Sequence, residues 1–310
     1  MKLLTSIYLV ASVSSYAAGF SAPPATATAA SLQSLLNANQ EKISSFKEIA
    51  QSISSDVAIA PTNDVFYLRY ALETSYETDE ERIDALKSNI QWRLNDGKDI
   101  VTNAYHAIQA ASNGEDSKWN NGPVQDAAPH ADRINKYLTS VQCITTSHPS
   151  SNDLIYCVRA GKIDDKALMS SVTVDEMFDF FMYVKEVNAA VADMRSIETD
   201  SLIKIVTCND LIGVKLVGGS SDFRSALSLS SKKATELYPS LSGRTLLLNL
   251  PALLGALVKL FTPLFPAAVM ERIRFERGPL KNVDDLKQIV ESGAARDEFV
   301  EQMNELVYSD

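Results

Sequence analysis

The sequence has little of what metal, redox and nucleotide sites require. Its three cysteines (Cys143, Cys157 and Cys208) form no CxxC pair and show no Cys/His spacing of a zinc site, so a disulfide framework is not expected either. The glycines form no G-x-G-x-x-G, which leaves a dinucleotide site without support, and no G-x-S-x-G is present as a hydrolase nucleophile. We therefore expect no metal, no cofactor and no enzymatic activity.

Positive charge is also in short supply. The chain has 29 Lys and Arg against 39 Asp and Glu, for a formal net charge of -10 and a pI near 4.9. Such a field repels nucleic acid, and no run of clustered Lys and Arg offers a local exception. The hydrophobic content of 45% is ordinary for a globular protein with a sizeable core. Nucleic acid is therefore not an expected partner. The protein is expected to be a monomer.

The N-terminus reads as a targeting leader. Residues 1–19 combine Lys2, an apolar stretch from Leu3 to Val13 and small residues at the end, as a signal peptide does. Residues 20–40 contain no acidic residue and are rich in Ala, Ser and Thr, which suits a transit peptide. The junction "AAGFSAP", with Phe20 first after cleavage, resembles the bipartite leader of proteins sent to complex plastids in algae. We expect a plastid location, with secretion or a retained anchor as the alternatives.

The next part of the chain has a helical pattern. Residues 41–110 are interpreted as a helical N-terminal lobe, whose clearest helix begins at Thr78 with Glu81 three positions on, the pattern of a capping box. Residues 111–153 are rich in Asn, Asp, Ser, Gly and Pro, with a short helix expected around 131–141. We interpret them as an insertion or linker between two regions.

From residue 154 to residue 310 strands and helices alternate. "LIYCVRAGK", "SLIKIVTCNDL" and "RTLLLNL" read as strands. A second capping box, Thr173 with Glu176, begins one intervening helix, and "DFRSALSLSSKKATELYP" reads as another that ends at Pro239. Because parallel neighbours need a crossover, this order predicts an α/β fold with a mixed, largely parallel sheet flanked by helices.

The most apolar run of the chain, "TLLLNLPALLGALVKLFTPLFPAAVM" from Thr245 to Met270, is divided by three prolines and Lys259, which excludes a straight membrane span. Its first part, Thr245–Leu250, predicts a central strand. Its second part, about 252–260, predicts a short helix that is apolar on nearly every face. Such a helix is either buried core or a surface that meets something nonaqueous.

Four stretches, in order, resemble the CRAL-TRIO lipid-binding domain family. From the N-terminus on they are "FYLRYALETSYETDEERIDALKSNIQWR", "YCVRAGKID", "IVTCNDLIG" and "ELYPSLSGRTLLLNLPALLGALVKLFTPLFPAAVMERIRF". The resemblance covers about residues 64–94 and 154–275. It implies a bilobal protein whose α/β lobe, residues 154–310 with C-terminal helices, holds one lipid or lipophilic molecule behind a mobile gate helix that meets the membrane transiently.

The resemblance also implies the ligand contacts. They are Thr207, Tyr238, Ser240, Leu246, Leu248, Leu253, Leu257, Phe261, Phe265 and Arg272, of which Leu253 and Leu257 belong to the gate helix. Family members that bind phosphatidylinositol carry a Glu after the Tyr-Pro, a Lys before the Ile of a later strand and a Lys in the helical lobe. This chain has Ser240, Arg272 and, more loosely aligned, Ser75 there. The departures weaken the case for phosphatidylinositol, although Arg272 can still hold a phosphate by a bidentate contact, and they leave a different phospholipid, a pigment, a quinone or a tocopherol-like molecule at least as plausible.

Two other functional classes stay open at this point. One is a protein-interaction scaffold that uses the same fold without a ligand. The other is an α/β hydrolase-like enzyme, for which "VGGSSDF" offers Ser220 and Ser221 but no obvious histidine partner.

Overall fold

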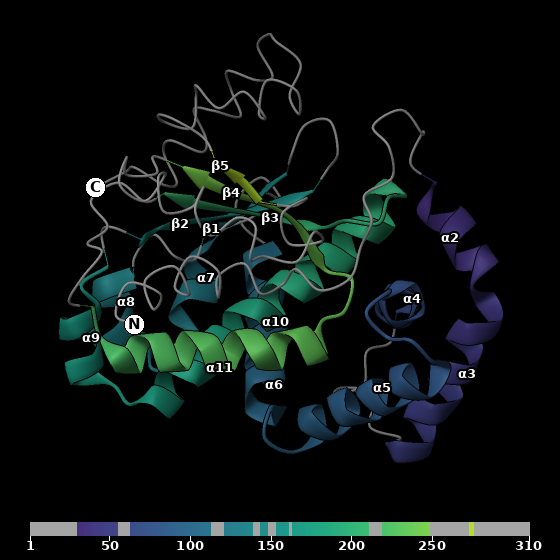
Figure 1. Cartoon of the computed structure of the whole chain (residues 1–310), viewed down its shortest axis with the longest axis horizontal. Coiled ribbons are helices and arrows are strands. Elements are labelled where there is room, and N and C mark those ends of the chain that lie inside the picture. The colour runs from purple at the N-terminus through teal and green to yellow at the C-terminus, as the bar shows by residue number, and fades with distance from the viewer. Residues whose placement is uncertain are drawn as a thin grey trace, which may run out of the picture.

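The computed structural model describes residues 30–54, 63–112, 121–138, 143–147, 153–160, 163–210, 219–248 and 273–275. In Figure 1 this part of the chain forms a sheet with helices on one face and further helices to one side. Its strands, in spatial as in chain order, are β1 (Cys143–Ser147), β2 (Leu154–Arg159), β3 (Ile205–Asp210), β4 (Ser242–Leu248) and β5 (Ile273–Phe275). β1 is antiparallel to β2, and the pairs from β2 to β5 are parallel.

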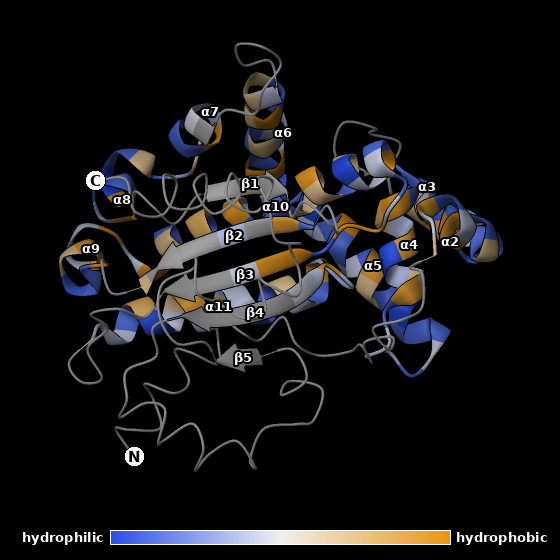
Figure 2. Cartoon of the chain, turned by 90° about the horizontal axis from the view of Figure 1, so that it is seen from above, coloured by the Kyte–Doolittle hydropathy of each residue, from blue (hydrophilic) through white to orange (hydrophobic). Residues whose placement is uncertain are grey.

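Helices connect the parallel strands, as parallel pairing requires. α9 (Asp165–Ser171) and α10 (Val174–Thr199) join β2 to β3, and α11 (Ser221–Leu237) joins β3 to β4. Figures 1 and 2 show α10 and α11 side by side on one face of the sheet. The fold class predicted from the alternation of strands and helices is confirmed.

The remaining described helices precede the sheet. They are α2 (Leu32–Ala38), α3 (Gln40–Ile53), α4 (Asp64–Leu72), α5 (Asp79–Leu94), α6 (Lys98–Ser112), α7 (Asn121–Asp126) and α8 (Ala131–Leu138). In Figure 1, α2 to α5 stand together to one side of the sheet and its helices. Among the helices in the described ranges, none has the length and apolar content that crossing a bilayer requires.

Both predicted capping boxes are present. At the start of α5 the Thr78 hydroxyl accepts from the Glu81 amide at 3.2 Å, and the Glu81 carboxylate accepts from the Thr78 amide at 3.4 Å. At the start of α10 the corresponding distances between Thr173 and Glu176 are 3.2 and 2.8 Å. Each box pairs two groups that a helix terminus leaves without an intrahelical partner.

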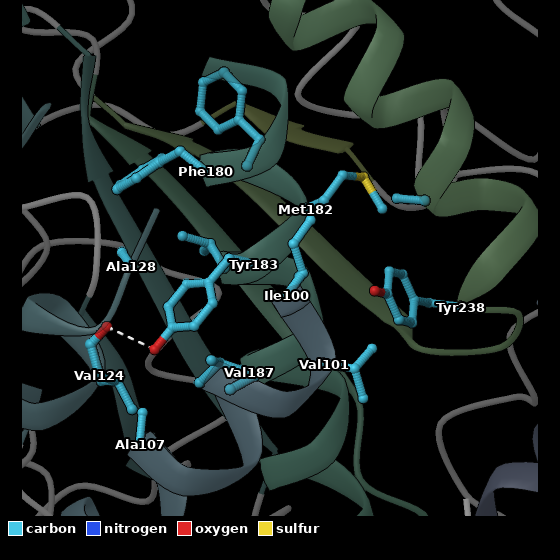
Figure 3. Packing of buried hydrophobic residues seen from close by; sticks show 14 of the residues in the cluster. Ile100, Val101, Ala107, Val124, Ala128, Phe180, Met182, Tyr183, Val187 and Tyr238 are labelled. Carbon is cyan, nitrogen blue, oxygen red and sulfur yellow. Dashed lines mark hydrogen bonds between the residues drawn. The ribbon is translucent and has the colours of Figure 1, made fainter. Parts of the chain in front are cut away.

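The larger hydrophobic cluster lies between the sheet and the helices beneath it. Phe180, Met182 and Tyr183 of α10 are among its most buried members. Figure 3 shows Tyr183 reaching α7, where its hydroxyl donates to the Val124 carbonyl at 3.0 Å. Side chains of α6, α7 and α8 also belong to this cluster. Packing therefore groups these three helices with the sheet, whereas the domain limits drawn from composition stay predictions.

A second cluster fills the helical lobe formed by α2 to α5. Its most buried side chains include Leu68, Tyr70 and Leu86. α2 falls within the segment 20–40, and its Leu32 is buried in this cluster. The first turn of α2 also docks on the end of α10, because the Leu32 and Gln33 amides donate to the Asp200 carbonyl and carboxylate, both at 2.9 Å.

Candidate functional site

The two faces of the sheet differ in what covers them. Leu154 and Ile205 pair in register and belong to the cluster beneath the helices, so they lie on the helix-covered face. Val206 is also buried but belongs to neither described cluster, as expected for the opposite face. By the same alternation Thr207, one of the expected ligand contacts, shares the face of Ile205.

Two expected ligand contacts occupy register positions on the other face. Leu246 pairs with Cys208 and Leu248 pairs with Asp210, and these β3 positions alternate with Thr207. Figure 2 looks onto this face, with α10 and α11 behind the sheet. Leu246 and Leu248 therefore share the face of Val206, and Thr207 does not.

The expected gate lies outside the described residues. This holds for Leu253, Leu257, Phe261, Phe265 and Arg272. The flanking strands are described: β4 ends at Leu248, and β5 resumes at Ile273 as its parallel neighbour.

Tyr238 and Ser240, the remaining expected contacts, lie in a polar contact between the lobes. We call this contact the seam and define it by α4–α5 residues Arg69, Glu73, Asn89 and Arg93, α10 residues Glu186 and Asp193, and the turn 237–240. All of these residues are almost fully buried. The turn joins α11 to β4, so the seam fixes the start of the strand that carries Leu246 and Leu248.

One half of the seam centres on Glu186. Its Oε2 accepts from the Arg93 guanidinium at 2.8 Å and from the Tyr238 hydroxyl at 2.9 Å. Arg93 also donates to the Asn89 amide oxygen at 2.8 Å, and Asn89 donates to the Leu237 carbonyl at 2.5 Å. Burial lowers the pKa of Arg93, but the charge and hydrogen bond of Glu186, together with Tyr238 and Tyr70, outweigh it, so the net pKa is raised. This half therefore holds a buried ion pair in which Arg93 is charged.

The other half holds Ser240, whose backbone is in the left-handed region with φ 56°. The Ser240 amide donates to the Glu73 carboxylate at 2.6 Å, and its carbonyl accepts from Arg69 at 3.2 Å. Lys204 donates to the same carbonyl and, at 3.1 Å, to the hydroxyl. A serine rarely adopts this conformation, and these contacts from the end of α4 and from the residue before β3 hold it there.

Arg69 extends this half to α10. Its Nε donates to Asp193 at 2.7 Å and its Nη2 donates to the Ile203 carbonyl at 3.0 Å. Burial raises the pKa of Asp193, against the opposing effect of Arg69. Arg69 thus forms an ion pair with Asp193, while Lys204 and Glu73 both contact Ser240, so two formal positive charges and two formal negative charges lie around this turn.

The equal numbers of positive and negative charges around Ser240 affect which lipid headgroup the turn at 237–240 can bind. The family resemblance implies a Glu at the position of Ser240 in members that bind phosphatidylinositol, and in this chain the Ser240 amide donates to the Glu73 carboxylate. A phosphate at this turn would lie beside the Glu73 carboxylate, and the positive charges of Arg69 and Lys204 are equalled in number by the negative charges of Glu73 and Asp193. The Ser240 turn is thus held by charged side chains of the protein itself.

The seam brings together residues that are far apart in the sequence. Arg69 and Asp193 are 124 positions apart, and Arg93 and Glu186 are 93 apart. No local spacing links such residues, and a charged residue inside a helical pattern is normally read as solvent-exposed. The one available signal was that Arg69 stands within an otherwise apolar and aromatic turn, "FYLRYAL".

The serine considered for catalysis has a capping role. The Ser220 hydroxyl accepts from the Phe223 amide at 3.3 Å at the start of α11, and the Ser220 amide donates to Asp165 at 2.6 Å. In the part of the chain whose side chains are described, no group of three or more His, Cys, Asp or Glu could hold a metal ion. The contacts of Ser220 are those of a helix N-cap.

A family model of known proteins supports the resemblance. Residues 141–294 match the family model of the CRAL/TRIO domain, a range that includes β1 to β5 and α9 to α11. The chain is also similar to a solved structure titled "Crystal structure of Sfh5", at 12% identity and a TM-score of 0.43, with 79% of each chain covered. No curated protein matches the chain. The family resemblance identified over residues 154–275 is thereby confirmed, and the one over residues 64–94 stays a prediction.

Proposed function

We propose that this protein binds one lipid or lipophilic small molecule and transfers or presents it at membranes. The observation that carries the proposal is the CRAL/TRIO match over residues 141–294. The proposed pocket lies on the sheet face of Val206, Leu246 and Leu248, opposite α10 and α11. An apolar surface there is stabilised by covering a ligand's hydrocarbon, because both surfaces are removed from water.

We further propose that the helix expected at about 252–260, with Phe261 and Phe265 after it, is the gate. An apolar gate covers the ligand when closed and enters the interfacial layer of a membrane when open, so either state shields it from water. Each fully buried Leu or Phe contributes roughly 1.5 to 3 kcal/mol, so several suffice to hold a lid.

The ligand class follows from the seam. Because Glu73 holds the Ser240 amide and the four charges around Ser240 balance, phosphatidylinositol is not the preferred cargo. A transfer assay tests this with donor and acceptor vesicles that carry labelled phosphatidylinositol, phosphatidylcholine, a quinone or a tocopherol in turn. We expect transfer of at least one of these, with phosphatidylinositol not the fastest. Transfer of none would contradict lipid exchange, and a preference for phosphatidylinositol would contradict the headgroup argument.

The gate is tested by comparing a charge in the proposed lid with a charge in the sheet. In Leu257→Asp, we expect a cooperative thermal transition and the loss of most lipid uptake, because a surface lid opens locally and solvates the carboxylate. In Leu248→Asp, we expect no folding, because an unpaired buried carboxylate costs several kcal/mol. Circular dichroism melts beside vesicle exchange measure both. If Leu257→Asp is as unfolded as Leu248→Asp, the apolar run is core.

We also propose plastid import, on the basis of the signal-like residues 1–19 and the acid-free segment that begins at Phe20. Because Leu32 is buried in the helical lobe, processing is expected before Ser31, the residue that caps α2. A fluorescent fusion of residues 1–60 should enter the plastid, and Phe20→Ala should divert it to the endomembrane system. Secretion of the unmutated fusion would contradict this location.

A further inference from the structure

All three cysteines of the chain occupy one register row of the sheet. Cys143 of β1 is the partner of Cys157 across the antiparallel pair, and Cys157 is the partner of Cys208 across the parallel pair. The row continues through Leu246 of β4 to Arg274 of β5. Nothing in the sequence shows this alignment, because the cysteines come from separate strands and form no motif.

Strand geometry decides what such a row can do. Partners on adjacent strands have Cα atoms about 4.5 to 5.5 Å apart, within the roughly 4.4 to 6.8 Å that a disulfide spans. The outer two, Cys143 and Cys208, are two strand spacings apart, about 10 Å. Since thiolates on one zinc ion each lie about 2.3 Å from it, three cysteines spread over this distance are poorly placed to share a metal. The row therefore suits a disulfide between neighbours.

We propose that this row is a redox modification site in which Cys157 forms a disulfide with Cys143 and Cys208 remains a thiol. The choice of partner follows from the two strand pairs. β1 is an edge strand of the described sheet, and its register shifts between Ile144 and Thr146, next to Cys143. β3 lies between β2 and β4, and it pairs with β2 through six consecutive partners without a shift. The edge strand adjusts to the bond more readily.

The chemistry balances with a hydroperoxide as the oxidant. One thiolate attacks hydrogen peroxide, the O–O bond breaks, and a sulfenic acid and water form once protons are counted. The second thiol attacks the sulfenic sulfur, forming the S–S bond and releasing another water. Two thiols and one peroxide thus yield one disulfide and two waters, and a dithiol such as dithiothreitol reverses the oxidation. This inference does not depend on the proposed lipid function.

Because strand residues alternate between faces, Cys208 shares the face of Val206, and its register partner Cys157 does so as well. The row is therefore on the face away from α10 and α11. The proposed disulfide fixes β1 to β2 without displacing the cluster that packs beneath the helices.

Peptide mapping of the full-length protein tests the proposal without a mutation. Reduced, desalted protein is treated with hydrogen peroxide, alkylated and digested with trypsin. Cys143 and Cys157 fall in one peptide, 137–159, and Cys208 falls in 205–215. We expect peptide 137–159 to lose two hydrogens and resist alkylation until dithiothreitol is added, while peptide 205–215 stays fully alkylated. A cross-link between the two peptides, or full alkylation of both, would overturn it.

Further experiments test whether strand pairing, and not the short separation of Cys143 and Cys157 along the chain, brings the two thiols together. Cys208→Ser should form the disulfide as the wild type does, and Cys143→Ser should leave Cys157 alkylatable. In urea, where the strands are absent, the yield of modified 137–159 should fall several-fold at the same peroxide dose. An equal yield in urea would mean that the short separation along the chain, and not the register, brings the thiols together.

Discussion

The helical lobe and the sheet lobe each enclose an apolar cluster, whereas the seam that joins them consists of buried charges and hydrogen bonds. The clusters contain Leu68 and Leu86 on one side and Phe180 and Val187 on the other, all almost fully buried. The seam contains the pairs Arg69–Asp193 and Arg93–Glu186, whose side chains are only 4 to 8% exposed. Two regions of similar burial are therefore stabilised by different interactions.

Apolar burial and buried ion pairs have different effects on the structure. Apolar burial is non-directional, so each cluster stabilises its own lobe without specifying how the lobes meet. Buried ion pairs contribute little net stability, but removing one partner leaves an uncompensated charge. We expect the seam to specify the fit between the lobes and the position of the turn that begins β4.

The largest expected effect comes from breaking the seam at Asp193. In Asp193→Ala, Arg69 remains as a buried cation without its carboxylate, and we expect a loss of about 3 to 5 kcal/mol in the free energy of unfolding. Denaturant titration measures it. The matched control is Glu236→Ala, which removes the exposed pair with Lys233 and should cost at most about 1 kcal/mol. Equal losses in the two variants would show that the buried Arg69–Asp193 pair matters no more to stability than the exposed Lys233–Glu236 pair.

An intermediate effect on stability is expected when a tyrosine hydroxyl is removed, either from the seam or from the larger hydrophobic cluster. Tyr238→Phe removes a hydroxyl bonded to the Glu186 carboxylate, and Tyr183→Phe removes one bonded to the neutral Val124 carbonyl. Because hydrogen bonds to charged groups are stronger, we expect a loss of about 1.5 to 3 kcal/mol for the first and about 1 kcal/mol for the second. The order of the two denaturation midpoints decides the matter. A larger loss for Tyr183→Phe would contradict the account.

The smallest effect is expected at a carboxylate outside the seam. Hydrogen bonds from Arg133 and from the Thr173 amide lower the pKa of Glu176 from 4.5 to about 2. Because the folded-state pKa is the lower one, its contribution is present above pH 4.5 and is lost as the pH falls towards about 2. The difference in stability between wild type and Glu176→Gln should shrink through that window. A constant difference would mean that the carboxylate charge contributes nothing.

How far the sequence predicts the structure depends on the range of the interaction. The capping boxes at Thr78 and Thr173 and the end of α11 near Pro239 were predictable, because each depends on residues within a few positions. The parallel sheet followed from the alternation of its elements.

Long-range features were not predictable from the residues themselves. The register that aligns Cys143 with Cys157 and Cys208, and the one that separates Thr207 from Leu246, depend on how strands pair. A shift of one residue would reverse every face. The placement of Tyr238 and Ser240 in the seam likewise depends on partners in distant helices, such as Glu186 and Glu73. The gate and Arg272 lie outside the described residues and stay predictions.

The most direct test of the central claim is native mass spectrometry of the protein purified without added lipid, followed by organic extraction. If the α/β lobe holds one lipophilic molecule, the folded protein should carry the extra mass of a single ligand. The extract should then contain a lipid, quinone or other lipophile of that mass in about equal amount to the protein. A native mass equal to that of the chain alone, together with no uptake from vesicles that offer the same lipid classes, would contradict the account.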